Sequence, residues 1–352
     1  MKRIGIIGVG GIANNVHIKE LLEVPECKIS AICDVDTKAI EKTKEKVGDV
    51  LVFSDYKELI DSGEVDAVEV CTPNHLHVEI AKYAVSKGLP VNVEKPLGLN
   101  TAECEELEKA ISENNAINMM CFSYRFKPAV RWAKDMIDQG LIGDIVTVNV
   151  EYSKSSAFWQ GRRLDWRFIK KYAGTGVLGD LAVHLIDMAQ LLVGDFKTVS
   201  ANTGIVVKER QLLDSDEWGK VETDDWCNFI ADLSDRRNGN NVSATFSITR
   251  CALGHGNTIR FDIFGTEGCI SFNLNNPNEL TFCTDKKDGF TAKLETAPVP
   301  EKYYVTQEQS FVDALHGKFC DYFPTVEDGI KCQKILDAVE HSAEERIVVS
   351  LN

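Results

Sequence analysis

The sequence predicts an α/β Rossmann domain followed by an α+β domain with a large, mostly antiparallel, open-faced sheet. Three observations predict this architecture. The first third of the chain alternates short apolar runs with amphipathic stretches, and a glycine-rich turn follows the first run. From about residue 125 the runs become longer and alternate between polar and apolar residues. A length of 352 residues also suits two domains better than one hydrophobic core.

Six short runs rich in β-branched residues are expected to form the strands of the first domain. Amphipathic stretches such as 102–112 separate them, and this alternation is typical of βαβ units in a parallel sheet covered on both faces. Six strands in this rhythm suit a doubly wound dinucleotide-binding domain, expected over residues 1–124. The expected strands are Arg3–Ile7, Ile29–Cys33, Val50–Phe53, Ala67–Cys71, Val91–Val93 and Ile117–Phe122.

The second domain, expected over residues 125–352, begins with a linking helix at 127–139 that Gly140 ends. Its longer alternating strands, separated by Gly, Asn and Asp, are typical of an antiparallel sheet. Beyond the linking helix, only 178–192 and 328–341 show a clear helical pattern. The expected strands are Ile145–Tyr152, Val199–Val207, Trp226–Leu233, Val242–Thr249, Ile259–Phe264 and Cys269–Phe272.

Charge and composition narrow the possible partners. The net charge of −15 argues against nucleic acid or an acidic membrane, because polyphosphate surfaces attract clustered Lys and Arg. No apolar run approaches the roughly 18–20 residues that span a bilayer, and the first residues lack a secretory signal, so a cytoplasmic protein is expected. The eleven cysteines are scattered without a CxxC pair, and His75 and His77 lack a Cys or carboxylate at ligand spacing. We therefore expect no metal site.

The glycine-rich turn after the first strand predicts a dinucleotide site. Gly8 permits a tight turn, Gly10 lets backbone N–H groups approach a pyrophosphate, and Ala13 allows close packing of helix on strand. The pyrophosphate then lies at a helix N-terminus, where free N–H groups and the helix dipole favour an anion. The expected contacts in this turn are Gly8, Gly10, Gly11, Ile12 and Ala13.

Asp34 ends the second expected strand, where this fold places the acid that binds the adenosine ribose hydroxyls. No arginine follows at once, and Asp36 adds a second carboxylate, so a 2′-phosphate would meet two negative charges. The cofactor is therefore expected to be NAD rather than NADP. Alternatively, Asp34 or Asp36 could cap a helix that begins near Thr37.

Two later strand ends lie at the carboxyl edge of the sheet, where ligands bind in this fold. Lys95 stands there between Glu94 and the rigid Pro96, from where it can reach the nicotinamide side. An ordinary surface lysine is the alternative. The cofactor contacts expected at these ends are Cys71, Thr72, Pro73, Asn74, His77, Glu94 and Lys95.

The chain resembles the glucose-fructose oxidoreductase and inositol dehydrogenase (Gfo/Idh/MocA) family over nearly its whole length. Two positions depart from the commonest pattern of the family. Thr175 replaces the middle of three glycines, and Ala182 replaces a glycine that is frequent before the histidine. These departures bear on substrate choice more than on catalysis. The resemblance rests on the glycine turn, Thr72–His77, Glu94-Lys95-Pro96, Tyr124-Arg125-Phe126-Lys127-Pro128, Gly174-Thr175-Gly176, Asp180-Leu181-Ala182-Val183-His184, Phe264–Gly268 and Glu327-Asp328-Gly329.

The resemblance implies a catalytic set of Lys95, Asp180 and His184. Asp180 and His184 are four residues apart on the helix expected after Gly179, so they project from one face. Oxidation of an alcohol requires a base near neutral pH, and histidine is the usual one. His184 would exchange the hydroxyl proton, Asp180 would orient it, and Lys95 would stabilise negative charge on the oxygen. From the residues alone, a structural contact between Asp180 and His184 is the alternative.

The segment 158–168 interleaves aromatic residues with Arg and Asp, which suits a sugar ring and its hydroxyls. An inert surface loop or a single-stranded nucleic-acid platform would have a similar composition. In relatives a Trp-Arg pair like Trp166-Arg167 contacts the cofactor side. The substrate contacts expected are Lys95, Tyr124, Trp159, Arg163, Asp165, Asp180 and His184.

Together these features predict an NAD-dependent dehydrogenase that acts on a secondary alcohol carbon of a sugar, sugar derivative or cyclitol, rather than on a hydroxy acid. Two alternatives are an NAD-binding regulator without turnover and a glycoside-cleaving enzyme that uses transient oxidation. A homo-oligomer, dimer or tetramer, is also expected. Its premise is that strands 242–249 and 259–264 carry apolar residues on both faces.

Overall fold

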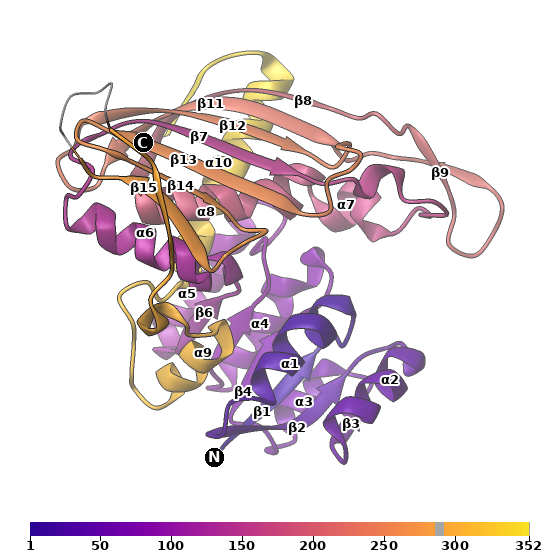
Figure 1. The fold of residues 1–352 in the computed structure, drawn as a ribbon. Helices are drawn as coiled ribbons and strands as arrows, with labels where there is room; N and C mark the ends of the chain where they lie inside the picture. Colours follow the sequence, from indigo (N-terminus) through magenta and orange to yellow (C-terminus); the bar gives the residue numbers. More distant parts are fainter. Residues whose placement is uncertain (286–291, 352) are drawn as a thin grey trace. The chain divides into compact units, whose positions relative to one another are not determined.

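The computed structural model describes residues 1–285 and 292–351, and the chain forms two compact units (Figure 1). The first unit consists of Met1–Ser123 and Val305–Gln333, and the second of Tyr124–Tyr304 and Lys334–Asn352. The α/β and α+β architecture expected from the sequence is confirmed. The division differs in one respect, because Val305–Gln333 returns to the first unit instead of staying with the second.

The first unit is built on a parallel sheet in the order β3-β2-β1-β4-β5-β6, the doubly wound order of dinucleotide-binding folds. All residues of β4 and β5 are buried, as expected for strands covered on both faces. The strands are β1 (Lys2–Ile7), β2 (Cys27–Cys33), β3 (Leu51–Phe53), β4 (Ala67–Val70), β5 (Val91–Val93) and β6 (Asn118–Met120). The helices are η1 (Ala13–His17), α1 (Ile18–Leu21), α2 (Thr37–Val47), α3 (Tyr56–Asp61), η2 (Asn74–Leu76), α4 (His77–Ser86), α5 (Thr101–Asn114) and α9 (Gln307–Leu315).

The returning segment is tied to the first unit by backbone and side-chain hydrogen bonds. The Met120 N–H donates to the Pro324 carbonyl over 3.1 Å, and the Val326 N–H donates to Asn118 Oδ1 over 2.8 Å. α10 (Val326–Glu345) begins here and continues into the second unit. These contacts are long-range in sequence, so the local pattern could not reveal them.

The second unit is built on a nine-stranded sheet in the order β16-β15-β14-β13-β7-β12-β11-β8-β17. Among the pairings that the described residues form in this sheet, only the β12–β7 pair is parallel. Its strands are β7 (Ile145–Ser153), β8 (Gly194–Gly204), β11 (Trp226–Asp235), β12 (Asn241–Thr249), β13 (Thr258–Gly265), β14 (Cys269–Asn273), β15 (Glu279–Cys283), β16 (Glu295–Pro298) and β17 (Val349–Ser350). A separate hairpin pairs β9 (Glu209–Gln211) with β10 (Trp218–Lys220). Its helices are η3 (Ser123–Phe126), α6 (Pro128–Asp138), η4 (Ser156–Phe158), η5 (Trp166–Phe168), α7 (Lys170–Ala173), η6 (Leu178–Ala182), α8 (Val183–Leu192) and η7 (Glu301–Tyr303).

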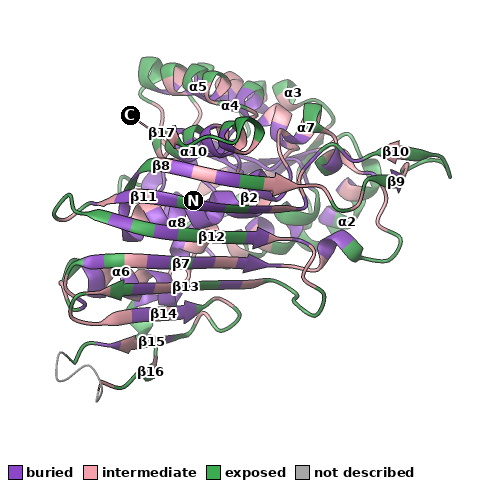
Figure 2. Cartoon of the chain, turned by 90° about the horizontal axis from the view of Figure 1, so that it is seen from above, coloured by how far each residue is buried: buried purple, intermediate pink, exposed green. Residues whose placement is uncertain are grey.

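One face of this sheet packs against α6 and α8, and the other is open (Figures 1 and 2). The expectation that both strands carry apolar residues on both faces is wrong for β12, whereas β13 has one exposed apolar residue, Phe264, on the open face. In β12, Val242, Ala244, Phe246 and Ile248 are buried, whereas the alternate positions hold exposed Asn, Ser and Thr. The open face is therefore largely polar, because small hydroxyl residues fill the positions between the core residues.

One helical stretch of the second unit passes the length and composition test for a membrane span. Among the described residues, Lys170–Leu192 has 23 residues and contains an apolar window with a mean hydropathy of 1.2, which corrects the expectation that no run approaches this length. In this stretch 78% of the apolar window is buried, as is typical of a core helix in a soluble protein.

Candidate functional site

The glycine turn of the first unit has the geometry of a phosphate-binding turn. Gly8 has a φ of +89°, and a Cβ there would lie 2.8 Å from the backbone of Cys71 and Thr72. A Cβ on Gly10 or Gly11 would meet no protein atom within 4 Å, so the space in front of the turn is open. A pyrophosphate can approach the backbone there. Ala13 is fully buried at the start of η1, which allows close packing on the sheet.

Asp34 is held against this turn. Its Oδ2 accepts the Val9 N–H over 2.8 Å, and its Oδ1 accepts the Asp36 N–H over 2.9 Å. Asp36, not Asp34, caps α2 by accepting the Lys38 N–H over 2.9 Å. Of the two carboxylates, Asp36 is therefore the helix cap, and Asp34 is fixed beside the turn.

The ends of β4 and β5 contain both accessible and buried side chains. Lys95, Thr72 and Pro73 are half-buried, whereas Cys71 and Asn74 are buried. His77 is also buried, and its two ring nitrogens lie 2.8 Å from the Pro96 carbonyl and 2.7 Å from that of Thr72. His77 therefore links the two strand ends, and both of its ring nitrogens lie against backbone carbonyls of the protein.

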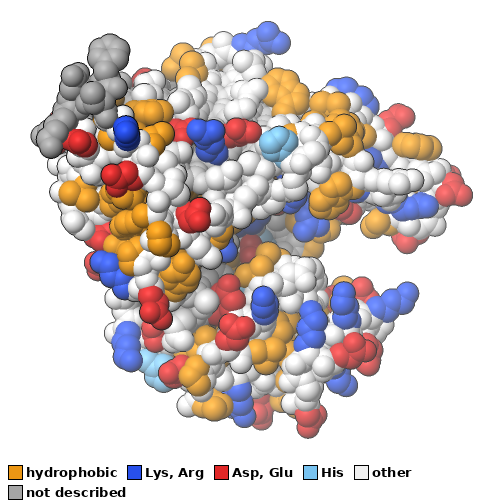
Figure 3. All heavy atoms as spheres, in the orientation of Figure 1, with side chains coloured by type: hydrophobic (Ala, Val, Ile, Leu, Met, Phe, Trp, Pro, Cys, Tyr) orange, Lys and Arg blue, Asp and Glu red, His pale blue; other side chains and the backbone are white. Residues whose placement is uncertain are grey.

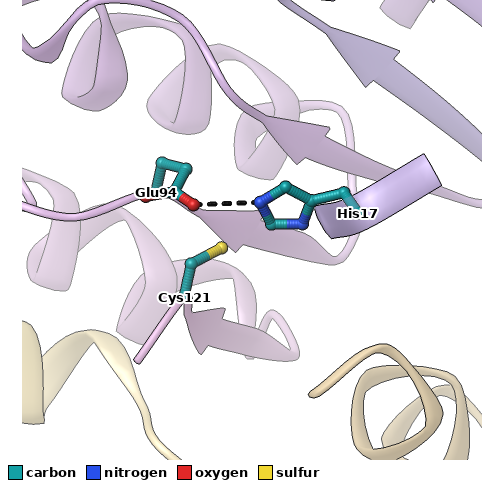
Figure 4. Close-up of side chains that lie close together, drawn as sticks. All are labelled: His17, Glu94 and Cys121. Atoms are coloured by element: carbon teal, nitrogen blue, oxygen red, sulfur yellow. Dashed lines mark hydrogen bonds and ion pairs between the residues drawn. The ribbon is translucent and has the colours of Figure 1, made fainter. Parts of the chain in front are cut away.

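Glu94 lies directly behind Lys95 and holds its backbone. Glu94 Oε2 accepts the Lys95 N–H over 2.9 Å, and Oε1 lies 2.9 Å from Nε2 of His17 (Figure 4). Burial favours the neutral acid, but the hydrogen bond and charge of His17 and the charge of Lys95 lower the pKa of Glu94 overall. Glu94 is therefore an ionised, buried support for Lys95.

In the second unit, the helix that carries Asp180 and His184 is positioned by a residue that the sequence did not single out. The Asp224 carboxylate accepts the Gly176 N–H over 2.6 Å and the Leu178 N–H over 3.0 Å. A Cβ on Gly176 would overlap the backbone of Asp224, which explains the glycine. Because these N–H groups are capped, the helix starts before Gly179 instead of after it.

Asp180 lies in the π-helical turn η6, and His184 follows in α8. π-helical turns inside helices are rare and frequent at functional sites. Asp180 is half-buried, and His184 is buried with 8% of its surface exposed. Both residues thus lie on one continuous helical segment, as the sequence predicted.

Tyr124 packs beside His184, with ring centroids 4.4 Å apart and ring planes 55° from parallel. The neighbouring Arg125 makes a bidentate contact with Asp187 on α8, with N–O distances of 2.6 to 2.9 Å. Both partners of this ion pair are buried. Because Asp187 lies three residues after His184, the pair fixes Tyr124 next to the candidate base.

Tyr124, Tyr152 and Asn257 form a closed hydrogen-bonded set. The Tyr152 hydroxyl donates to Asn257 Oδ1 over 2.7 Å, Asn257 Nδ2 donates to the Tyr124 hydroxyl over 3.2 Å, and the two hydroxyls lie 3.2 Å apart. Burial raises the pKa of Tyr152, and Tyr124 and the Asp180 carboxylate raise it further. Tyr124, which packs against His184, is thus linked to neutral hydroxyl and amide groups, and Tyr152 among them lies near enough to Asp180 to feel its charge.

In the segment 158–168, called the aromatic segment below, several polar side chains form hydrogen bonds with other groups of the protein. Arg163 donates to the carbonyls of Leu212 and Ser215 over 2.7 and 2.6 Å, which holds the β9–β10 hairpin. Asp165 caps η5 by accepting the Arg167 N–H over 2.9 Å. These contacts give Arg163 and Asp165 structural roles that compete with the expected substrate contacts.

The aromatic side chains of the segment remain accessible. Trp159 is 52% exposed, and the Arg162 guanidinium lies 5.4 Å from its ring centroid. Trp166 is half-buried, with the exposed Arg167 lying 4.4 Å over its ring. Both tryptophans can therefore offer a ring face to a ligand.

Sequence reasoning missed five residues that the structure places beside or behind the expected site residues of their own unit: His17 in the first unit, and Tyr152, Asp187, Asp224 and Asn257 in the second. Tyr152 and Asn257 carry no motif, because a strand end and a polar loop bring them to Tyr124 only in the folded chain. Asp224 could have been suspected, since aspartate side chains are favoured at helix caps and turns, where they accept backbone N–H groups. His17 lies at a helical position, where its burial could not be read from the sequence.

The fold and these features define an oxidoreductase with an NAD-binding Rossmann domain. The first unit supplies an open glycine turn, an aspartate held beside that turn and a lysine whose backbone is held by Glu94. The second supplies a histidine with an acid on one helix and neutral polar groups beside it.

Comparison with known proteins agrees. Residues 2–122 match the oxidoreductase family with an NAD-binding Rossmann fold, and residues 130–271 match the GFO/IDH/MocA C-terminal domain. The chain is 33% identical to levoglucosan dehydrogenase of Pseudarthrobacter phenanthrenivorans, over 81% of this chain and 77% of that protein. It is 24% identical to inositol 2-dehydrogenase of Rhizobium meliloti, over 99% of both chains. The chain belongs to the Gfo/Idh/MocA family, which confirms the resemblance seen in the sequence.

Solved structures support the same assignment over the full chain. Levoglucosan dehydrogenase in complex with NADH and L-sorbose superimposes with a TM-score of 0.90 at 29% identity, over 100% of this chain and 99% of that one. Its complex with NADH and levoglucosan gives a TM-score of 0.89 at 29% identity, over 99% of both chains.

Proposed function

We propose that this protein is an NAD-dependent dehydrogenase that oxidises a secondary alcohol carbon of an uncharged cyclic polyol, either a sugar, a sugar derivative or a cyclitol. The observation that carries the proposal is the arrangement around His184. His184, with Asp180 on the same helical segment, packs against Tyr124, and the Tyr124 hydroxyl is hydrogen-bonded to the neutral side chains of Tyr152 and Asn257. The relatives named above as levoglucosan and inositol dehydrogenases support the substrate class.

The residues of the first unit suit NAD. The backbone at Gly10 and Gly11 would receive the pyrophosphate, because a Cβ at either position would meet no protein atom within 4 Å. Asp34, held by the Val9 and Asp36 N–H groups, would accept hydrogen bonds from both ribose hydroxyls. Bound NAD would supply the hydride acceptor for the reaction.

His184 takes the hydroxyl proton as the carbinol carbon is oxidised to a ketone, and in the reverse direction it returns the proton. Asp180 lies on the same helical segment as His184 and orients the His184 side chain. Lys95 provides positive charge for the oxygen on which negative charge develops. Tyr124, fixed by the Arg125–Asp187 pair, limits the positions that the substrate can take beside the base.

The engagement of Arg162 and Arg163 supports an uncharged substrate, while the third arginine of the segment, Arg167, lies over the Trp166 ring. Arg163 holds the carbonyls of Leu212 and Ser215, and Arg162 donates to the Ser156 carbonyl over 3.0 Å. A carboxylate or phosphate is usually recognised by a guanidinium that offers two parallel N–H groups. The groups beside His184 instead match hydroxyls, which both donate and accept. Trp159 and Trp166 offer faces for the C–H side of a ring.

We also propose a cytoplasmic homo-oligomer that binds neither nucleic acid nor membrane. On the face drawn in Figure 3, Lys and Arg are interspersed with Asp and Glu. Such a mixed distribution does not favour binding to nucleic acid or to an acidic membrane. Across residues 1–285 and 292–351 the cysteines form no disulfide, as suits a reducing compartment. On the open sheet face Val146, Ile230 and Phe264 are 52%, 54% and 41% exposed, and a second copy would cover them.

A parallel screen tests the proposed function. Purified protein with NAD is offered levoglucosan, hexoses, glycosides, inositols, glucose 6-phosphate and 2-hydroxy acids, and NADH formation is followed. The proposal expects turnover with one or more uncharged ring polyols and little with the anions. Turnover confined to hydroxy acids or sugar phosphates would overturn it. Tight NADH binding without any turnover would favour the regulator without catalysis, and release of sugar from glycosides without net NADH would favour glycoside cleavage.

A further inference from the structure

A buried histidine in the first unit lies among three glutamates from three other elements. His17, at the end of η1, has no exposed surface. Its Nδ1 lies 2.8 Å from Glu69 Oε2 of β4 and 2.8 Å from Glu308 Oε1 of α9. Its Nε2 lies 2.9 Å from Oε1 of Glu94, which follows β5 (Figure 4). Both ring nitrogens therefore face carboxylate oxygens.

This geometry requires a doubly protonated ring. A neutral imidazole would turn one nitrogen lone pair toward a carboxylate, whereas the imidazolium donates from both nitrogens. Burial lowers the pKa of His17, but the negative charge of the neighbouring Glu69 carboxylate is among the contributions that raise this pKa well above its ordinary value overall. Burial and the neighbouring Glu69 raise the pKa of Glu308 to about 8, so Glu308 holds a proton at neutral pH.

This cluster also contains the side-chain types that bind metals. Two groups have their ligand atoms close enough together to share one ion: His17 with Glu94 and Cys121, and His17 with Glu69 and Cys71. Protons account for the contacts instead. Cys121 Sγ donates to Asn92 Oδ1 over 3.2 Å, and burial raises the pKa of Cys71 to about 12, so both sulfurs are thiols. Metals bind the thiolate rather than the thiol. Both nitrogens of His17 are also used by carboxylates at hydrogen-bond distance.

The His17 cluster leads directly to Lys95. One oxygen of Glu94 accepts from His17, and the other accepts the Lys95 N–H over 2.9 Å. On the far side of Lys95, the Pro96 carbonyl lies 2.8 Å from Nδ1 of His77. The backbone that carries Lys95 is therefore held before and after the residue, and His17 is the cation on which the first of these supports depends.

We propose that His17 is a positioning residue for the reaction: its charged ring fixes Glu94, and through Glu94 it fixes Lys95 in the orientation that stabilises charge on the substrate oxygen. This inference rests on the role proposed for Lys95. His17 touches neither substrate nor cofactor in this scheme. Its effect reaches the reaction only through Lys95, and that dependence can be measured.

The experiment compares His17→Gln and Glu94→Gln with Leu59→Ala, a control that removes buried apolar contacts from α3 in the same unit. Gln at position 17 can donate to Glu94 or to the Glu69–Glu308 side, but not to both. Folding is verified by thermal unfolding, and NADH affinity by fluorescence titration. The orientation of Lys95 is then followed without any substrate, by competitive acetylation of the holoprotein with acetic anhydride and mass spectrometry. Lys82, paired with Glu106 on the surface, is the internal reference.

We expect the Lys95-to-Lys82 acetylation ratio to change at least about 3-fold in His17→Gln and Glu94→Gln, and to stay at the wild-type value in Leu59→Ala. With a substrate from the screen, His17→Gln should lower kcat by about 10–100-fold, the scale of a misplaced catalytic group, and change NADH affinity by less than about 3-fold. In a Lys95→Ala background the same substitution should have almost no further effect, because it acts through the missing residue.

Two results would overturn the inference: an unchanged acetylation ratio in His17→Gln, or an equal loss of kcat with and without Lys95. A stoichiometric metal that survives EDTA treatment would also overturn it in favour of a metal centre. Failure of the proposed function looks different, because Lys95→Ala would then leave turnover at the wild-type level.

Discussion

Asp34 is expected to decide between NAD and NADP, and the structure allows the size of its effect to be worked out. Its two oxygens are held by the Val9 and Asp36 N–H groups at 2.8 and 2.9 Å, so the carboxylate cannot swing away from an incoming 2′-phosphate. Two unit charges about 5 Å apart repel by roughly 3 kcal/mol at an effective dielectric constant near 20. The wild-type protein should therefore bind NADH about 100-fold more tightly than NADPH.

The perturbation is Asp34→Asn, which keeps the shape and removes the charge. NADH binding should weaken by about 10–100-fold, because charge-assisted hydrogen bonds to the ribose become ordinary ones and one of the two N–H groups loses its acceptor. NADPH binding should improve as the repulsion disappears, so that the two affinities approach each other. Fluorescence titration with NADH and NADPH measures both without a substrate.

Asp36→Asn is the matched control, since it removes the same charge two residues away, where the side chain caps α2 through the Lys38 N–H. It should leave the ratio of the two affinities within about 3-fold of wild type, because a solvated charge further away is screened. Equal binding of the two cofactors by the wild-type protein, or an equal shift in both variants, would refute the reasoning.

Three further predictions follow from the site. Lys95→Ala and His184→Ala should each lower kcat by about 10²–10⁴-fold, while NADH binding largely survives in His184→Ala; wild-type turnover would contradict the assignment. Glu308 has a folded pKa of about 8 against an ordinary 4.5, so the native state holds a proton that the unfolded chain releases, and stability should fall as pH rises from 4.5 through 8. Glu308→Gln, which imitates the protonated acid, should flatten this fall in urea titrations at pH 6 and pH 8.5, and an identical slope would show that Glu308 does not titrate there. Asp187→Asn should lower thermal stability by leaving Arg125 buried without its charge partner, and should raise KM as Tyr124 loses its anchor; an unchanged KM in folded protein would mean that Tyr124 is held by other contacts.

The sequence predicted those features that depend on local pattern or on a motif. The six parallel strands, the glycine turn and the helical segment with Asp180 and His184 all depend on neighbours within a few residues. The open face of the large sheet was misjudged, because Ser243, Thr245 and Ser247 alternate with the core residues of β12 and leave that face polar. The membership of Val305–Gln333 in the first unit depends on contacts with residues about 200 to 290 positions away, such as Asn118 and His17. No local pattern carries that information.

Three of the residues that sequence reasoning missed, Asp224, Asp187 and His17, share a physical property: each holds a part of the candidate site in place through a buried polar contact. Asp224 caps the helix of Asp180, the Arg125–Asp187 pair fixes Tyr124, and His17 fixes Glu94. Buried ion pairs contribute little net stability compared with apolar packing, yet removing one partner costs about 3–5 kcal/mol. Their value here is therefore directional, since a bidentate or doubly donating contact permits one orientation where apolar packing permits several. A motif records the group that reacts, whereas the group that orients it is set by the fold and can lie anywhere in the chain.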